Sequence, residues 1–378
     1  MAQVRRGWSV WLMAAGALLV AAGALTLVDD GKAAAEKSAG SAAAKTGHVP
    51  EVAAMLQNLT VDPVRKHQNM LVFPVRYGGK QVPGEWTTLD DAAAAGSLKV
   101  LEKDQASVPE VTMENAGAKT ILVLSGEIIK GGKQTRLSRK DAILEPKQRV
   151  ALAVFCVEQN RWAGSKEFTG SGFIAPASIQ DSVKRGAEQG EVWHRVREVN
   201  KAVGAKSATD SLEEGLSSPA ARQSGGAARG SLGKFSPPDT IGIAVADART
   251  GRVVGLELFG TRALFERLQD KLIEGYALDL VPPGSVWNDA DARKVTEKDV
   301  EAFIARVLGG TSRYEPTPGS GRGIDLVAGT MRGKGVAQGD SILHLSIQDV
   351  QPSVSPVRPI VNSPPTSQSP IRSLPRSD

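Results

Sequence analysis

Two residue types that build special sites are scarce in this sequence. Its 378 residues include one cysteine, at position 156, and four histidines, at positions 48, 67, 194 and 344. A single cysteine excludes an intramolecular disulfide framework and a cysteine-rich zinc or iron–sulfur site. His67 and His194 have no ligand-type residue at zinc spacing, and no calcium loop is present. We therefore expect neither a metal nor a cofactor.

An excess of one charge is also missing. The chain carries 46 Lys and Arg against 41 Asp and Glu, a formal net charge of +5. It has no basic stripe interleaved with aromatic residues, which make up only 4% of the chain. Such a stripe is typical of nucleic-acid binding, so no nucleic-acid partner is expected. The hydrophobic content of 41% suffices for a core and excludes a wholly disordered chain.

The one long hydrophobic run lies at the N-terminus. Arg5 and Arg6 precede residues 7–28, which carry no charge. A basic segment before an apolar one predicts an export signal, and residues 22–24 (AGA) offer a cleavage site. The run could equally span a bilayer uncleaved. We expect an exported protein, periplasmic or otherwise extracytoplasmic, or one anchored in the inner membrane, with residues 1–28 as signal peptide or membrane anchor.

Three further segments are weak in apolar residues. Residues 29–49 are rich in Ala, Lys, Ser and Gly and predict a flexible tether. Residues 351–378 are rich in Pro and Ser and predict a disordered tail, because their few apolar side chains cannot offset chain entropy. Residues 207–240 or so predict an exposed loop. One domain is therefore expected over residues 50–350.

Strands and helices alternate in this domain without a regular βαβ rhythm. The pattern predicts an α+β fold with a mixed or antiparallel sheet and packed helices. Residues 119–129 and 150–157 are apolar on both parities, which is typical of central strands covered on both faces. Further strands are predicted at 71–77, 108–114, 241–246, 253–259 and 341–348, the third and fourth as a hairpin, and helices at 88–96, at 190–203, after Thr261 and after Thr296.

Two segments could carry chemistry, and each lies at the end of an apolar strand. They are GEIIKGGKQTR at residues 126–136 and CVEQNRW at residues 156–162. Strand alternation puts Glu127 and Glu158 on apolar faces, where a carboxylate must be paired or have a raised pKa. The candidate partners of these two carboxylates are Lys130, Lys133, Arg136 and Arg161.

Two interpretations of these segments stay open. In the structural one, the charges form an internal salt-bridge network that locks a hairpin to its neighbour. In the functional one, Glu127 and Glu158 are candidate catalytic groups that act as acid and base or orient a ligand. The anion-binding candidates in that interpretation are Lys133, Gln134, Arg136 and Arg161.

Other sites are disfavoured by their spacing. The GGK at residues 131–133 lacks the spacing of a phosphate-binding loop and predicts a tight turn. Cys156 stands between Phe155 and Val157 with no base at a predictable position, so we expect a buried, inert thiol. No nucleophile elbow of the GxSxG type is present.

The same two segments resemble a known bacterial family of uncharacterised domains. The Gly-Glu strand end at Gly126, the turn at residues 131–136 and the CVEQNRW segment are similar to motifs of the ARG- and rhodanese-phosphatase-superfamily-associated protein domain family. ARG stands for ADP-ribosylglycohydrolase. The sequence GLELFG at residues 255–260 extends the resemblance, which covers roughly residues 60–345. The resemblance implies a link to NAD or ADP-ribose metabolism and identifies no catalytic residue.

Two functions follow as hypotheses. The leading one is a binding or enzymatic domain that engages a small anionic molecule, nucleotide-like or ADP-ribose-like. The competing one is a non-enzymatic envelope scaffold, in which the anchor, the tether and the tail contact a protein partner, lipid or cell wall. An uncleaved anchor would make the membrane a partner in either case. Whether the protein is an enzyme stays open.

Overall fold

The computed structural model describes residues 47–103 and 109–349 of the chain. Its largest element is a nine-stranded antiparallel sheet with the order β1-β3-β13-β14-β18-β17-β16-β15, in which β2 also pairs with β3. The strands are β1 (Leu59–Val61), β2 (Arg65–His67), β3 (Met70–Tyr77), β13 (Thr240–Asp247), β14 (Arg252–Phe259), β15 (Thr311–Glu315), β16 (Arg322–Ala328), β17 (Met331–Gln338) and β18 (Ser341–Gln348).

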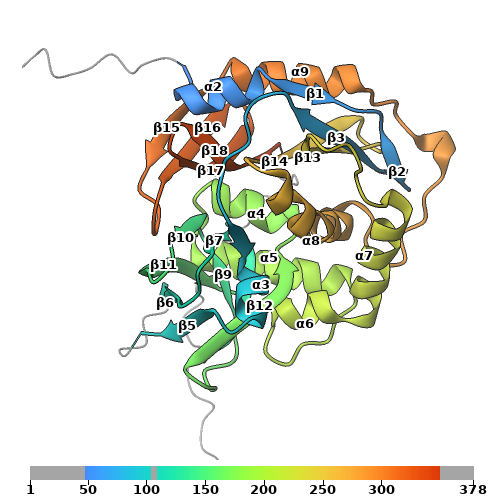
Figure 1. Ribbon diagram of the computed structural model, residues 1–378. Coiled ribbons are helices and arrows are strands. Elements are labelled where there is room, and N and C mark those ends of the chain that lie inside the picture. The colour runs from blue at the N-terminus through green and yellow to red at the C-terminus, as the bar shows by residue number, and fades with distance from the viewer. Residues whose placement is uncertain (1–46, 104–108, 350–378) are drawn as a thin grey trace, which may run out of the picture. The chain divides into compact units, whose positions relative to one another are not determined.

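Alternating side chains give the centre of this sheet two apolar faces. In β3, Phe73 and Val75 pack in the cluster that includes helices α2 and α9, whereas Met70 and Val72 pack in the cluster of α8. Because both faces are covered, β13 is buried at every position. Figure 1 shows α2 and α9 on one side of the sheet and α8 on the other. These helices are α2 (Pro50–Leu56), α8 (Arg262–Leu280) and α9 (Glu297–Leu308).

Local signals placed several boundaries correctly. The Thr261 side chain accepts a hydrogen bond from the Ala263 N–H and caps α8. Thr296 and Asp299 form a capping box at the start of α9. The predicted hairpin is confirmed as β13 and β14, and Gly251 in its turn has a φ of 70°. Such a φ favours glycine.

Residues 86–174 form a closed six-stranded barrel with the order β11-β6-β5-β12-β8-β9 and a three-stranded sheet β10-β7-β4. Val100, Met113 and Ile129 belong to the apolar cluster of this region. Only β4 and β7 pair in parallel among the described strands. The α+β prediction is confirmed. The strands are β4 (Trp86–Thr88), β5 (Leu98–Glu102), β6 (Glu110–Asn115), β7 (Thr120–Val123), β8 (Glu127–Gly131), β9 (Arg136–Ser138), β10 (Ala142–Leu144), β11 (Arg149–Cys156) and β12 (Glu167–Ile174), and α3 (Leu89–Ala94) follows β4.

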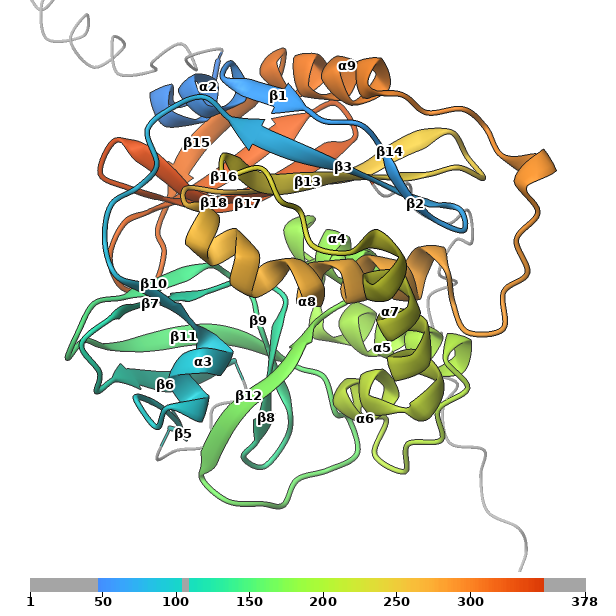
Figure 2. The same cartoon turned by 45° about the vertical axis from the view of Figure 1, so that its right-hand side comes forward.

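The exposed loop predicted around residues 207–240 is wrong. Most of this segment is helical, and Ser211 and Ser218 cap the two helices. Ala228 and Leu232 pack in the cluster of α8. The many Gly, Ser and Ala residues leave only a narrow apolar stripe, which hid the helices from a periodicity argument. Figure 2 shows a helical layer beside the barrel, made of α4 (Ala177–Lys184), α5 (Gln189–Ala202), α6 (Leu212–Ser217) and α7 (Pro219–Leu232); a short 3-10 turn, η1 (Asp289–Asp291), lies between α8 and α9.

The single strand predicted over residues 119–129 is also wrong, because the chain turns at Gly126. Strand β7 ends before this turn and β8 begins after it. Gly126 has a φ of 90°, and a Cβ there would lie 3.0 Å from the Gln180 side chain. The turn therefore requires glycine both for its conformation and for space. Coverage on both faces is confirmed, since Ile128 and Ile129 belong to different apolar clusters.

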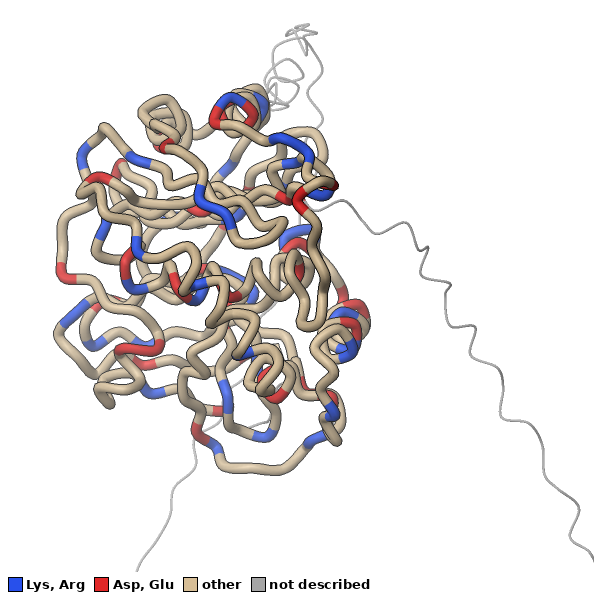
Figure 3. The backbone as a smooth tube through the Cα atoms, turned by 90° about the vertical axis from the view of Figure 1, so that its right-hand side faces the viewer, with Lys and Arg blue, Asp and Glu red and all other residues tan. Residues whose placement is uncertain are grey.

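The expectations for the two chain ends lie outside the described residues. They are the signal or anchor at residues 1–28, most of the tether at 29–49 and the tail at 351–378. Within residues 47–103 and 109–349, none of the helices combines the length and the apolar character that a membrane crossing requires. Figure 3 shows basic and acidic residues interspersed along the backbone of the domain.

Candidate functional site

Glu158 lies just beyond the end of β11 and is the most heavily hydrogen-bonded carboxylate of the predicted set. It accepts hydrogen bonds from the N–H and Oγ1 of Thr135, both at 2.9 Å, and from Thr209 Oγ1 at 2.9 Å. Arg161 donates from Nε and Nη2, both at 2.7 Å. Burial alone would raise the pKa of Glu158, but these donors outweigh it and lower the pKa to about 2. The carboxylate therefore stays ionised.

All the N–H donors of Arg161 bind acceptors within the protein. Besides Glu158, its Nη1 donates to the carbonyls of Gly132 at 2.8 Å and Ala163 at 2.7 Å, and its Nη2 donates to the carbonyl of Gly131 at 3.2 Å. A guanidinium has five N–H donors, and all five are engaged here. The hydrogen bond to Glu158 raises the pKa of Arg161, and this effect exceeds the lowering that burial causes.

The tight turn predicted at residues 131–133 supplies two of these carbonyls. Gly131 and Gly132 both have a positive φ, 115° and 54°. A Cβ on Gly132 would lie 2.2 Å from the Phe168 ring. The turn thus requires glycine, and its carbonyls hold Arg161 in place. We call Glu158, Arg161, Thr135 and Thr209 the rim.

The other predicted anion-binding residues also have internal partners. Arg136 is fully buried, donates to Gln134 Oε1 at 3.0 Å and lies 3.4 Å from Glu102. The Gln134 amide donates to the Glu158 carbonyl at 2.9 Å. The Lys133 ammonium lies 5.3 Å from the centre of the Trp162 ring. None of Lys133, Gln134 and Arg136 lines the pocket next to the rim.

Glu127 lies at the other end of β8, and its partner comes from a distant helix. Its carboxylate is 2.6 Å from the ammonium of Lys271 in α8 and accepts a 2.8 Å hydrogen bond from the Leu124 N–H. Lys271 also pairs with Asp90 of α3. Burial raises the pKa of Glu127 more than Lys271 lowers it. The structure thus gives Glu127 a partner outside the four cations that the sequence offered.

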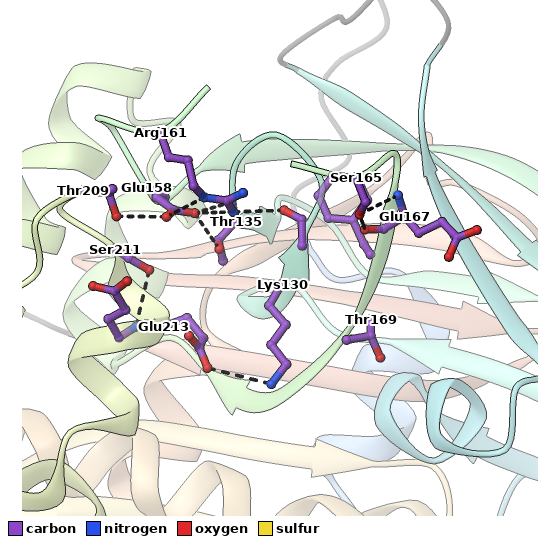
Figure 4. A pocket seen from close by; sticks show the side chains of 13 residues that line it. Lys130, Thr135, Glu158, Arg161, Ser165, Glu167, Thr169, Thr209, Ser211 and Glu213 are labelled. Atoms are coloured by element: carbon purple, nitrogen blue, oxygen red, sulfur yellow. Dashed lines mark hydrogen bonds and ion pairs between the residues drawn. The ribbon is translucent and has the colours of Figure 1, made fainter. Parts of the chain in front are cut away.

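A pocket of about 650 Å³ opens next to the rim. Figure 4 shows its walls: Lys130 of β8 lies between Glu213 on one side and Thr169 of β12 on the other. Of the predicted site residues, Glu158 and Arg161 line it, and Glu127 does not. Its lining consists of five hydroxyl side chains (Thr135, Ser165, Thr169, Thr209 and Ser211), four carboxylates (Glu158, Glu167, Glu213 and Glu214), two cations (Lys130 and Arg161), Phe168 and Gly131.

One wall of the pocket comes from the segment that the sequence left as a loop. The Leu212 N–H donates to the Val157 carbonyl at 2.9 Å, and the Asn160 N–H donates to the Thr209 carbonyl at 3.0 Å. These bonds fix the start of α6 against the chain that follows β11. The sequence held a signal for this wall, since Ser211 and Glu214 have the spacing of a capping box. Glu167 carried no comparable signal.

The pocket lining consists mainly of hydroxyl and charged side chains. The described residues hold no group of three or more His, Cys, Asp or Glu side chains arranged for a metal ion. Cys156 is fully buried, as predicted, and its thiol donates to the Glu158 carbonyl at 3.2 Å. Because Glu158 is saturated with donors and its pKa is about 2, it is unsuited to proton transfer near neutral pH.

A second buried ionic group lies between the barrel region and the large sheet, and sequence reasoning missed it. His344 Nδ1 lies 2.7 Å from Asp141, and its Nε2 lies 3.6 Å from Glu257. Tyr276 and Ser346 donate to Glu257 at 2.7 and 2.9 Å. Burial would lower the pKa of His344, but Asp141 and Glu257 outweigh it and raise the pKa to about 9.

This group and the one around Glu127 join the barrel region to α8 and the nine-stranded sheet. Both consist of buried or largely buried charges that meet across long sequence distances. No short motif could have predicted such pairs. We call the six charged residues of the two groups the seam: Asp90, Glu127, Asp141, Glu257, Lys271 and His344.

The family resemblance is confirmed. The family model of the ARG and Rhodanese-Phosphatase-superfamily-associated Protein domain matches residues 58–348, which is more than half of the chain. The chain therefore belongs to this family. No curated protein and no solved structure matches the chain.

Proposed function

We propose that this domain is a binding module that takes a small, hydroxyl-rich molecule, such as a sugar or the ribose of a nucleotide, in the pocket next to the rim. The observation that carries the proposal is the lining of the pocket. Five hydroxyl side chains and four carboxylates surround a volume of about 650 Å³, which lies within the usual range for small-ligand sites. Hydroxyl side chains pair with the hydroxyl groups of a ligand as donors and as acceptors, and ionised carboxylates pair with them as acceptors.

The rigidity of the walls supports binding. Arg161 ties the turn at Gly131 and Gly132 to Glu158, and Glu158 ties that assembly to Thr209. The rim thus connects three chain segments before any ligand arrives, which limits the entropy cost of binding. The family name refers to ADP-ribosylglycohydrolases, whose substrates contain ribose, and a ribose would suit the hydroxyl lining.

Of the two roles in the leading hypothesis, binding and catalysis, we propose binding. Neither predicted carboxylate is placed for acid–base chemistry, because Glu158 is saturated with donors and Glu127 is buried against Lys271. The scaffold hypothesis depends on the anchor, the tether and the tail, and the contacts that support the binding module lie within the described domain. The binding module is therefore the function that we put forward.

The test is thermal denaturation of the full-length chain with ribose, glucose, glucosamine and ADP-ribose. A ligand at about a hundred times its dissociation constant adds roughly 2.7 kcal/mol of stability. Thr169→Val keeps the shape of a lining residue and removes its hydroxyl, so we expect about fivefold weaker binding of whichever probe shifts the melting temperature. Thr311→Val, on the distant edge strand β15, is the matched control. If no probe shifts the melting temperature, or if both variants respond alike, the proposal fails.

A further inference from the structure

A second pocket, of about 320 Å³, lies where α7, the turn between β2 and β3 and the segment after α8 meet. Helix α7 packs against both β2 and α8 (Figure 1). The walls come from residues 67–68, from one face of α7 and from residues 281–285. The pocket shares no lining residue with the one next to the rim, so it can act independently of it.

Small side chains on α7 explain why this space is hollow. Ala220, Gln223, Ser224 and Ala227 line the pocket, and their i, i+3, i+4, i+7 spacing places them on one side of the helix. The two alanines end at Cβ and cannot fill the space in front of them. The opposite wall, residues 281–283 (VPP), is apolar. A flat apolar group therefore fits between the helix and this segment.

Hydrogen bonds join each pair of the three walls. His67 Nδ1 of β2 lies 3.0 Å from Ser231 Oγ of α7. The Ser224 hydroxyl donates to the Val281 carbonyl at 2.8 Å and ties α7 to the segment after α8. The Asn69 amide, in the turn between β2 and β3, donates to the last carbonyl of α8 at 2.8 Å. Because the walls are held before any ligand arrives, binding costs little ordering entropy.

The lining carries no formal charge. Among the described residues that line the pocket there is no Asp, Glu, Lys or Arg. Burial lowers the pKa of His67, so its imidazole is neutral above neutral pH. A charged ligand would lose hydration in this pocket without gaining a charged partner, and that loss is costly. The walls therefore favour an uncharged ligand.

Two polar side chains of the lining keep hydrogen-bonding groups in reserve. Gln68 makes no side-chain hydrogen bond to a described residue, and its Oε1 is enclosed. His67 is only 9% exposed, and its one hydrogen bond to a described residue engages Nδ1, which leaves Nε2 without a partner. Buried polar groups that lack a partner cost free energy, so a polar molecule that pairs with them gains binding energy.

We propose that this pocket is a second ligand site of the domain, which takes a small uncharged ring compound that bears a carboxamide group. The carboxamide of the ligand pairs with that of Gln68 as donor and as acceptor. It also suits Nε2 of His67 in either tautomer, because it offers both an N–H and a carbonyl. The ring lies against Ala227 and the two prolines after α8, where it buries apolar surface.

Three probes with the same ring test the preference for an uncharged ligand in the full-length protein. Benzamide, benzoate and benzylamine are neutral, anionic and cationic at about pH 7.5, given the ordinary pKa values of carboxyl and amino groups. Ligand-observed NMR titration measures each dissociation constant. We expect a value of about 1 mM for benzamide. The two ions should bind about tenfold more weakly or worse, because neither finds an opposite charge in the lining.

Two variants assign the binding to this pocket. Ala227→Leu fills the hollow in front of α7 and should weaken benzamide binding about tenfold or more, and the helix should persist because leucine favours helices and Ala227 is exposed. Ala305→Leu, at an exposed position of α9, is the matched control and should bind benzamide like the wild-type chain. Gln68→Glu keeps the shape of the side chain and introduces a charge. It should weaken benzamide about fivefold and strengthen benzylamine.

The charge preference and the location of the site can fail separately. Benzamide that binds no more tightly than the two ions, or that does not bind at about 10 mM, would overturn the uncharged ligand. Benzamide binding that survives Ala227→Leu, or that Gln68→Glu leaves unchanged, would overturn the location. Thr169→Val, in the pocket next to the rim, should leave benzamide binding as it was, so this result does not depend on the proposed sugar site.

Discussion

The seam and the rim both bury carboxylates beside cations, but they hold them differently. In the seam, Glu127 has two hydrogen-bond donors, the Lys271 ammonium and the Leu124 N–H. In the rim, Glu158 accepts five hydrogen bonds. Two come from Thr135, one from Thr209, and two from the Nε and Nη2 of Arg161. Burial raises the pKa of Glu127, whereas the donors lower that of Glu158 to about 2. At Glu127 burial outweighs the two donors, whereas at Glu158 the donors together outweigh burial.

The two regions also differ in what their charges connect. The seam residues come from the barrel region, α3, α8 and the nine-stranded sheet, so they hold large parts of the domain together. The rim residues come from three neighbouring segments at the mouth of one pocket. The structural interpretation of the charged motifs therefore describes the seam best. The rim is structural in its contacts and borders the candidate ligand site.

Removal of Glu127 should give the largest effect, because it leaves Lys271 buried with only Asp90 as a partner. We expect Glu127→Ala to lower the free energy of unfolding by about 3 kcal/mol, measured by urea denaturation. The double variant Glu127→Ala with Lys271→Met removes the stranded charge and should recover most of this loss. A loss below about 1 kcal/mol, typical of an exposed pair, would place the seam in the same class as surface salt bridges.

The stabilisation that the seam provides should also decrease at alkaline pH. The pKa of His344 is raised from 6.5 to about 9, so its contribution to stability is fully present below pH 6.5 and is lost as the pH rises through 9. The shift corresponds to at most about 3 kcal/mol. Urea denaturation between neutral and alkaline pH should show this decline, and His344→Gln should remove it.

His194→Gln provides the control for that experiment. His194 lies on the exposed side of α5, where its side chain is 45% exposed. Its replacement should leave the alkaline decline intact. If His344→Gln and the wild-type chain lose stability in parallel above neutral pH, the seam histidine does not carry a charge in the folded state.

The sequence predicted those features of the fold that depend on residues close together in the chain. The caps at Thr261 and Thr296 and the hairpin around Gly251 depend on residues within a few positions of each other. Helix α7 was missed because its Gly- and Ala-rich sequence has little apolar contrast, and packing against α8 stabilises it instead. The short helix α6 packs Leu212 and Leu216 in the cluster that includes α5. The turn at Gly126 was missed because apolar residues flank it on both sides.

In the candidate site, too, contacts between residues close in sequence were easier to predict than contacts between distant residues. Glu158 and Arg161 are three residues apart, and Arg161 was one of the four candidate partners that the motifs offered. Thr209 joins them from 51 residues away, and Lys271 meets Glu127 from 144 residues away. Sequence periodicity contains no information on contacts of that separation. The anion hypothesis counted cations in the motifs and could not show that the fold would engage Arg136 and Arg161 with internal partners.

The smallest effect should come from the rim at acid pH. The pKa of Glu158 is lowered from 4.5 to about 2, so its contribution to stability is present above pH 4.5 and is lost as the pH falls through 2. Because Arg161 is 27% exposed and water screens the pair, we expect a loss of about 2 kcal/mol rather than the full shift. Acid denaturation monitored by circular dichroism should show this limb, and Glu158→Gln should flatten it while Glu301→Gln on α9 should not. If Glu158→Gln keeps the whole acid limb, the five donors do not hold an ionised carboxylate, and the contrast between rim and seam disappears.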